Sequence, residues 1–231
     1  MVKISLVSVL VTLTLASVTP VAMALPGLGD AMKGVMPGAE KSAEADGATQ
    51  LSAADAQDSI VTEFREILRD VTVAQGALLT ALGMKDQGDA AQADAKAMSG
   101  ECDTKCIEEG IARSAELDKM IESAMSDADA MQAVSKEEAG KAIVPWLKAG
   151  LRTAQYIPKL GAWGKSATTE IKGAGVMGAA KMKKKFSQGL FIVTNAPGAA
   201  KKWFSTIKLA RDVFKKNDIS YEGANDFDFE N

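Results

Sequence analysis

Apolar residues spaced three or four positions apart are the feature of this sequence that most limits its fold. They recur from Ile60 onward at Ile60, Phe64, Ile67, Leu68, Val71, Leu78, Leu79 and Leu82, with charged residues between them. Such a stripe is typical of an amphipathic helix that packs against a core. Ser52, followed by Asp55, fits the helix N-cap. The spacing therefore predicts a helix from about Ser52 to Met84.

The same spacing predicts helices in later segments. They are expected at residues 103–134, 135–156 and 198–216, with a short helix or loose connection at 86–98. Asp103 and Ser135 are candidate N-caps. Pro145 should kink the third helix or mark a boundary in it, and Pro158 with Gly161 should end it.

Between the third and last helices, residues 168–186 can form a helix whose glycines and alanines allow close packing. The run Leu190–Thr194 favours a β-strand.

The composition supports the same fold class. Aromatic residues make up 5% of the chain and there are only 6 prolines. Abundant Ala, Met, Lys and Glu favour helices over strands. We expect an all-α fold, a bundle of about three to five helices spanning residues 51–216. A flexible leader at 25–50 and an acidic tail at 217–231 should flank it.

The N-terminal residues have the order of a secretory signal peptide. Lys3 is followed by an uncharged apolar stretch at residues 4–18, then by Pro20 and the small-residue site Ala22-Met23-Ala24. A membrane anchor is the alternative, which the proline and the small residues disfavour. We therefore expect cleavage of residues 1–24 after Ala24. The mature protein should be exported, either periplasmic or secreted.

Charge is divided unevenly along the chain. Residues 25–145 carry 11 basic and 23 acidic side chains, residues 146–216 carry 15 basic and two acidic ones, and residues 217–231 carry five acids and no base. The acidic and basic parts could face each other, or their solvated faces could simply differ. Alternatively, the basic part could hold an anionic partner, such as a lipid surface or an envelope polymer.

The candidate binding residues combine cations with aromatic side chains. They are Lys181, Lys183, Lys184, Lys185, Lys201, Lys202, Trp203, Phe204, Lys208 and Arg211. A helix with aromatics on one side and cations on the other can lie on an anionic membrane. The same pattern is also typical of a helix whose aromatics face the protein core. Nucleic acid is the weaker partner, because the chain has a net charge of −3 and is expected to be exported.

Cys102 and Cys106 are the only cysteines. In an exported protein such a pair is expected to form a disulfide, with interchain pairing or a redox or metal role as weaker alternatives. Side chains four residues apart on an ideal helix have Cβ atoms about 5–6 Å apart, whereas a disulfide needs roughly 3.5–4.5 Å. The bond therefore requires Cys102 to lie at or just before the start of a helix, as an N-cap at Asp103 would allow.

The sequence contains no histidine, which excludes Ser-His-Asp and Cys-His catalysis. The segment Gly173–Gly178 resembles the glycine-rich turn of nicotinamide-dependent dehydrogenases, but no buried strand precedes it. Small residues for tight helix packing are the alternative interpretation of this segment. The segment Gly161–Ser166 resembles the end of a phosphate-binding loop but lacks the first glycine and the strand. We expect no cofactor and no metal.

These observations favour an exported, non-enzymatic binding or structural protein of the cell envelope. The second hypothesis is a membrane-active or lipid-associated protein that uses the basic part, residues 146–216. A third is an enzyme with carboxylates such as Glu108, Glu109 or Glu116. A protein partner or self-association is also compatible with the sequence.

Overall fold

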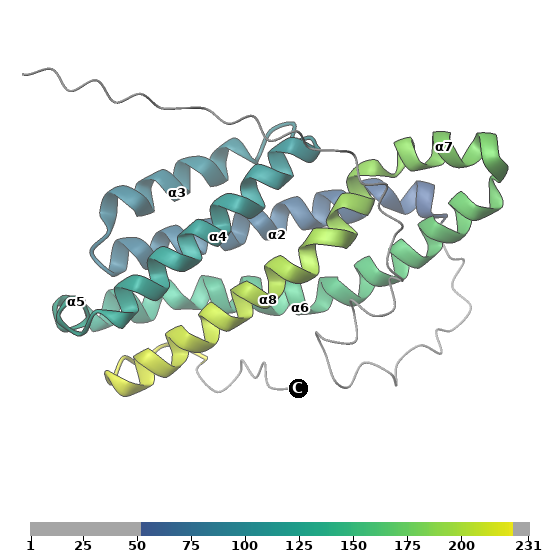
Figure 1. The fold of residues 1–231 in the computed structure, drawn as a ribbon. Helices are drawn as coiled ribbons and strands as arrows, with labels where there is room; N and C mark the ends of the chain where they lie inside the picture. The colour runs from purple at the N-terminus through teal and green to yellow at the C-terminus, as the bar shows by residue number, and fades with distance from the viewer. Residues whose placement is uncertain (1–51, 224–231) are drawn as a thin grey trace, which may run out of the picture.

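Seven α-helices make up most of residues 52–223, the part of the chain that the computed structural model describes, apart from the side chain of Ala130. Labelled as in Figure 1, they are α2 (Ala53–Ala81), α3 (Lys85–Ala97), α4 (Thr104–Ser126), α5 (Ala128–Ala133), α6 (Lys136–Gly173), α7 (Gly175–Lys185) and α8 (Ser187–Lys216). No strand occurs in this described part. The predicted all-α class is confirmed, whereas the expected number of three to five helices is lower than the seven in these residues. The predicted signal peptide and leader lie outside the described residues, as does the tail beyond residue 223.

Four long helices form the body of the molecule. α2 packs against α4 and α6, α8 packs against the same two helices, and α3 folds back along α2 (Figure 1). α6 runs antiparallel to α2, because late residues of α6 meet early residues of α2. The Tyr156 hydroxyl donates to the Ile60 carbonyl at 3.0 Å, and Trp163 Nε1 donates to the Ala53 carbonyl at 2.9 Å.

The apolar stripe predicted from Ile60 to Leu82 lies in the core, and every one of its residues is buried. All three predicted N-caps are also confirmed. The side chains of Ser52, Asp103 and Ser135 each accept a hydrogen bond from the backbone N–H three residues later. The first helix ends at Ala81 rather than near Met84, because Gly83 adopts a positive φ of 84° and turns the chain toward α3.

The predicted end of the third helix at Pro158 and Gly161 is wrong. α6 continues to Gly173, with both Pro145 and Pro158 inside it. Both prolines lie on the exposed face, where water can bond the carbonyls that lose their helical partners. On the opposite face Trp163 is buried against α2 and α8. Burial of the face that carries Trp163 therefore offsets the loss of helix stability that proline and glycine cause.

The β-strand expected at Leu190–Thr194 is also wrong, because these residues belong to the first turns of α8. Ile192, Val193 and Ala196 are buried together on one side of that helix, at helical spacing. The helix expected at residues 103–134 is divided in two. Asp127 adopts an extended conformation with ψ of 107° and separates α4 from α5.

Tight helix packing was expected at Gly173–Gly178, but only Gly178 is closely approached, since a Cβ atom there would stand 2.9 Å from Cβ of Ala174 in the preceding turn. A Cβ atom added at Gly173 or Gly175 would meet nothing within 4 Å. The close approach lies at Gly189, where a Cβ would stand 2.2 Å from Cη2 of Trp163. Gly189 therefore allows the indole ring of α6 to lie directly against the backbone of α8. The chain instead turns at Ala174, between the end of α6 at Gly173 and the start of α7 at Gly175, and Gly175 has a φ of 66° there.

Candidate functional site

A disulfide joins Cys102 and Cys106, as predicted, with their Cα atoms 5.2 Å apart. Cys102 precedes α4, and Asp103 caps that helix by accepting a hydrogen bond from the Cys106 N–H at 2.9 Å. The bond therefore holds the chain at the entry to α4. Its loop is too short for a large effect on the entropy of the unfolded chain.

Replacing both cysteines with serine should lower the free energy of unfolding by about 2 kcal/mol or less. Denaturant unfolding monitored by circular dichroism would measure the change. A reductant should destabilise the natural protein to a similar extent and leave the double variant unaffected. A loss of about 4 kcal/mol or more would show that the bond does more than close this short loop.

The acidic and basic parts of the chain contact each other along α2 and α6. Arg152 pairs with Glu66 and, at 3.0 Å, with Asp70, and Lys159 pairs with Glu63 at 3.1 Å. The hydrogen bond from Arg152 lowers the pKa of Glu66. These contacts neutralise part of the positive charge of α6 within the protein itself.

The lysines of α7 have no such partners. Lys181, Lys183, Lys184 and Lys185 are all exposed. None of them makes an ion pair with an acidic side chain in residues 52–223. α7 also contains no buried residue. Its four ammonium groups are therefore accessible to a partner.

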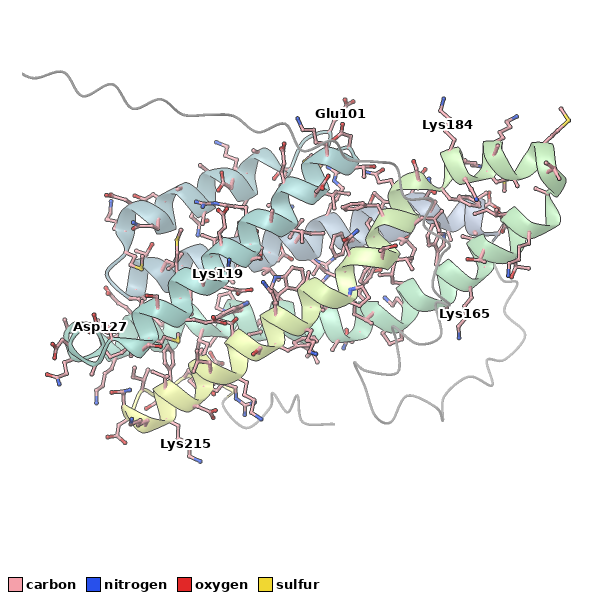
Figure 2. All side chains as sticks on the ribbon, in the orientation of Figure 1. Glu101, Lys119, Asp127, Lys165, Lys184 and Lys215 are labelled. Carbon is pink, nitrogen blue, oxygen red and sulfur yellow. A yellow bond between two sulfur atoms is a disulfide. The ribbon has the colours of Figure 1, made fainter. Side chains whose placement is uncertain are left out.

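The candidate residues of α8 form a second, separate group. Lys201, Lys202 and Lys208 are exposed and Arg211 is half-buried. Lys201 lies 14 residues after Ser187, the first residue of α8, which corresponds to about 21 Å along that helix. Figure 2 shows Lys184 on α7 near one end of the molecule and Lys215 of α8 near the other. The structure therefore does not bring all the predicted binding residues to one place.

The aromatic residues of this second group face the protein interior. Trp203 is 1% exposed, and its Nε1 donates to Ser114 Oγ on α4 at 2.9 Å. Phe204 is half-buried and packs against the same core. In this fold the aromatic side chains of α8 thus pack in the core, and the indole of Trp203 is not on the protein surface where a membrane could contact it.

Two exposed apolar residues at the α6–α7 turn were not predicted from the sequence. Val176 is 94% exposed and Met177 is 92% exposed. The next most exposed large apolar side chain in the described part is Leu151, at 44%. The available signal in the sequence is a pair of large apolar residues flanked by glycines and followed by lysines.

A buried polar cluster links α2, α4 and α8 in the core. Gln75 donates to Asp118 Oδ1 at 2.7 Å and accepts from Ser114 Oγ at 2.9 Å. Asp118 is 2% exposed, and its Oδ2 has no hydrogen-bond partner among the described residues. Burial raises the pKa of Asp118 to about 7, and the nearby Glu122 adds to the rise. This carboxyl group lies inside the bundle, where the charge of the exposed Lys202 of α8 partly opposes the rise.

The carboxylates considered for catalysis lie on the outer surface of α4. Glu109 pairs with Lys105 and Glu116 pairs with Arg113, while Glu108 is exposed. Within residues 52–223, no three acidic or cysteine side chains gather in a way that could hold a metal ion. In the same range, no helix has both the length and the apolar character needed to cross a membrane.

Comparisons with protein-family models, with curated proteins and with solved structures give no match to this chain.

Proposed function

We propose that this protein is an exported, non-enzymatic binding protein of the cell envelope, and that α7 holds an anionic partner. The observation that carries the proposal is the set of four exposed lysines on α7 without an ion pair to the described residues. Like charges gathered within five residues repel one another, and an anion bound beside them relieves that repulsion.

The surroundings of α7 strengthen its positive potential. The sequence has no acidic residue between Glu170 and Asp212. Glu170 accepts a hydrogen bond from the backbone N–H of Ala53, so this carboxylate is held toward α2. By contrast, the cations Arg152 and Lys159 of α6 already pair with acids of α2. The α7 lysines are therefore the basic group best placed to bind a phosphate or sulfate group outside the protein.

The positions of the acidic groups favour binding over catalysis. Asp118 is enclosed in the core, and the carboxylates of Glu109 and Glu116 are engaged in exposed ion pairs on α4. General acid–base catalysis requires a group within hydrogen-bond reach of a bound substrate. None of these three groups lies beside the lysines of α7, where we place the partner.

Replacing Lys183, Lys184 and Lys185 with glutamate should weaken binding to anionic vesicles by at least about 100-fold, because each lysine near an anionic surface contributes about 1 kcal/mol. Flotation with phosphatidylglycerol vesicles, neutral phosphatidylcholine vesicles and soluble dextran sulfate measures the effect. Binding should weaken as salt increases. The dextran sulfate arm separates a polymer partner from a lipid partner.

The matched control carries the same charge change on α8, with glutamate at Lys201, Lys202 and Lys215. This variant should keep most of the binding. Equal losses in the two triple variants would contradict a site on α7, because only the net charge would then matter. Negligible binding of the natural protein to both anionic vesicles and dextran sulfate would refute the proposal itself.

A further inference from the structure

We propose that the anionic partner is a lipid bilayer and that the α6–α7 turn inserts Val176 and Met177 into it. This inference rests on the proposed binding by α7, and it identifies the partner. The two residues are adjacent, and they are 94% and 92% exposed. They contribute nothing to the core, so their contact with water is unfavourable unless another apolar phase covers them.

The tip of the turn is built to present these side chains outward. Gly173 and Gly175 have open space around them, and Gly175 adopts the positive φ that reverses the chain. The half-buried residues of α7 are Gly178, Ala179 and Met182, which lie on the side that packs against the rest of the protein. Val176 and Met177 therefore stand at the end of a helical hairpin that lies at one end of the bundle (Figure 1).

Lysines follow the apolar tip on the same face of α7. Met177, Lys181 and Lys184 are spaced four and three residues apart, so they share one helical stripe. Along the helix axis the two lysines lie about 6 Å and about 10 Å from Met177. Interfacial helices bury apolar side chains about 5–10 Å into the boundary between head groups and acyl chains. When Met177 lies among the acyl chains, the ammonium groups of Lys181 and Lys184 therefore reach the lipid phosphates.

A lysine on the other arm of the hairpin supports the same orientation. Lys172 is exposed in the last turn of α6, just before the turn. The apolar pair is therefore flanked by cations on both helices, and no acidic residue lies between Glu170 and Asp212. The apolar tip thus lies between cations on both sides. This arrangement fits a bilayer, in which anionic head groups cover an apolar layer of acyl chains. A soluble polyanion would leave Val176 and Met177 in water.

Serine at both Val176 and Met177 should weaken binding to phosphatidylglycerol vesicles by about 100-fold, about tenfold for each side chain withdrawn from the acyl region. Flotation measures the partition. The control is Leu151→Ser, which removes a 44% exposed apolar side chain of α6 away from the turn. This control should bind as the natural protein does. A double serine variant with unchanged partition would overturn the insertion.

A direct measurement of depth uses Met177→Cys labelled with a polarity-sensitive dye, and Ala162→Cys on the exposed side of α6 as the control position. On anionic vesicles the dye at 177 should shift to the blue and be quenched by lipids brominated in their acyl chains, whereas the dye at 162 should not. Binding that depends on the α7 lysines without a shift at 177 would refute insertion and leave the proposed function standing. No binding to anionic vesicles would refute the lipid partner, and retained binding to dextran sulfate would then favour a polymer.

Discussion

Replacing Asp118 with asparagine should raise the free energy of unfolding at pH 8 by up to about 4 kcal/mol, since each pKa unit corresponds to about 1.4 kcal/mol of difference between the two protonation states. The carboxyl is 2% exposed, and burial raises its pKa to about 7 from an ordinary value of 3.8. Asparagine has nearly the same shape, can accept the hydrogen bond from Gln75 and never ionises.

The pH dependence of this effect has a definite sign. In the unfolded chain the carboxyl loses its proton near pH 4, whereas in the folded protein it keeps the proton until about pH 7. Between these values the folded state binds more protons, so stability falls as the pH rises and levels off above about pH 7. The asparagine variant should lack this contribution, and its advantage should vanish below about pH 4.

Denaturant unfolding of the natural protein and of Asp118→Asn at pH 4 and pH 8 would measure both the gain in stability and its pH dependence. Asp89→Asn is the control, since Asp89 is 63% exposed and forms an exposed ion pair with Lys85. That control should change stability by less than about 1 kcal/mol at either pH. An Asp118→Asn variant less stable than the natural protein at pH 8 would mean that the ionised carboxylate is held by attraction, with Lys202 as the cation that acts on it.

The sequence predicted those parts of the fold that depend on local chemistry. The N-caps at Ser52, Asp103 and Ser135 were correct, because a cap is formed by a side chain and a backbone N–H three residues apart. The apolar stripe from Ile60 to Leu82 was correct for a similar reason, since helical periodicity marks the buried face directly. The disulfide was predicted because Cys102 and Cys106 are the only cysteines of a chain expected to be exported, and their spacing required Cys102 to lie at or before the helix start.

Errors arose where distant parts of the chain outweigh local preference. Pro158 was expected to end a helix, but α6 continues past it because the following turn buries Trp163 against Gly189 of another helix. Likewise, β-branched Ile192 and Val193 favour a strand in isolation, yet their burial on one side of α8 keeps them helical. No local pattern contains these contacts.

The candidate site was predicted in part. Lys181, Lys183, Lys184 and Lys185 were identified from a pattern that combines cations with aromatic residues, and the structure leaves these lysines exposed. The sequence could not decide which way Trp203 faces, because a core-facing helix and a membrane-facing helix have the same periodicity. The sequence gives no prediction for Val176 and Met177, because two apolar residues do not form a periodic pattern. Only their exposure in the folded protein distinguishes them.

Replacing Trp203 with alanine should lower the free energy of unfolding by about 3–5 kcal/mol, and the melting temperature by about 10 °C. The side chain is 1% exposed, and its Nε1 bonds Ser114 Oγ. Its removal leaves a cavity between α8 and α4. Thermal unfolding by circular dichroism measures the change, and Trp203→Phe, which keeps most of the volume, should lose less.

The Trp203→Ala variant also distinguishes the two roles that the sequence left open for Trp203, which are packing in the core and contact with a membrane. At a temperature where Trp203→Ala remains folded, its binding to anionic vesicles should equal that of the natural protein, because the indole lies in the core. Met177→Ala should behave in the opposite way, with an unchanged melting temperature and weaker binding, because that side chain is 92% exposed. A Trp203→Ala variant with normal stability and lost binding would mean that α8, rather than the α6–α7 turn, meets the membrane.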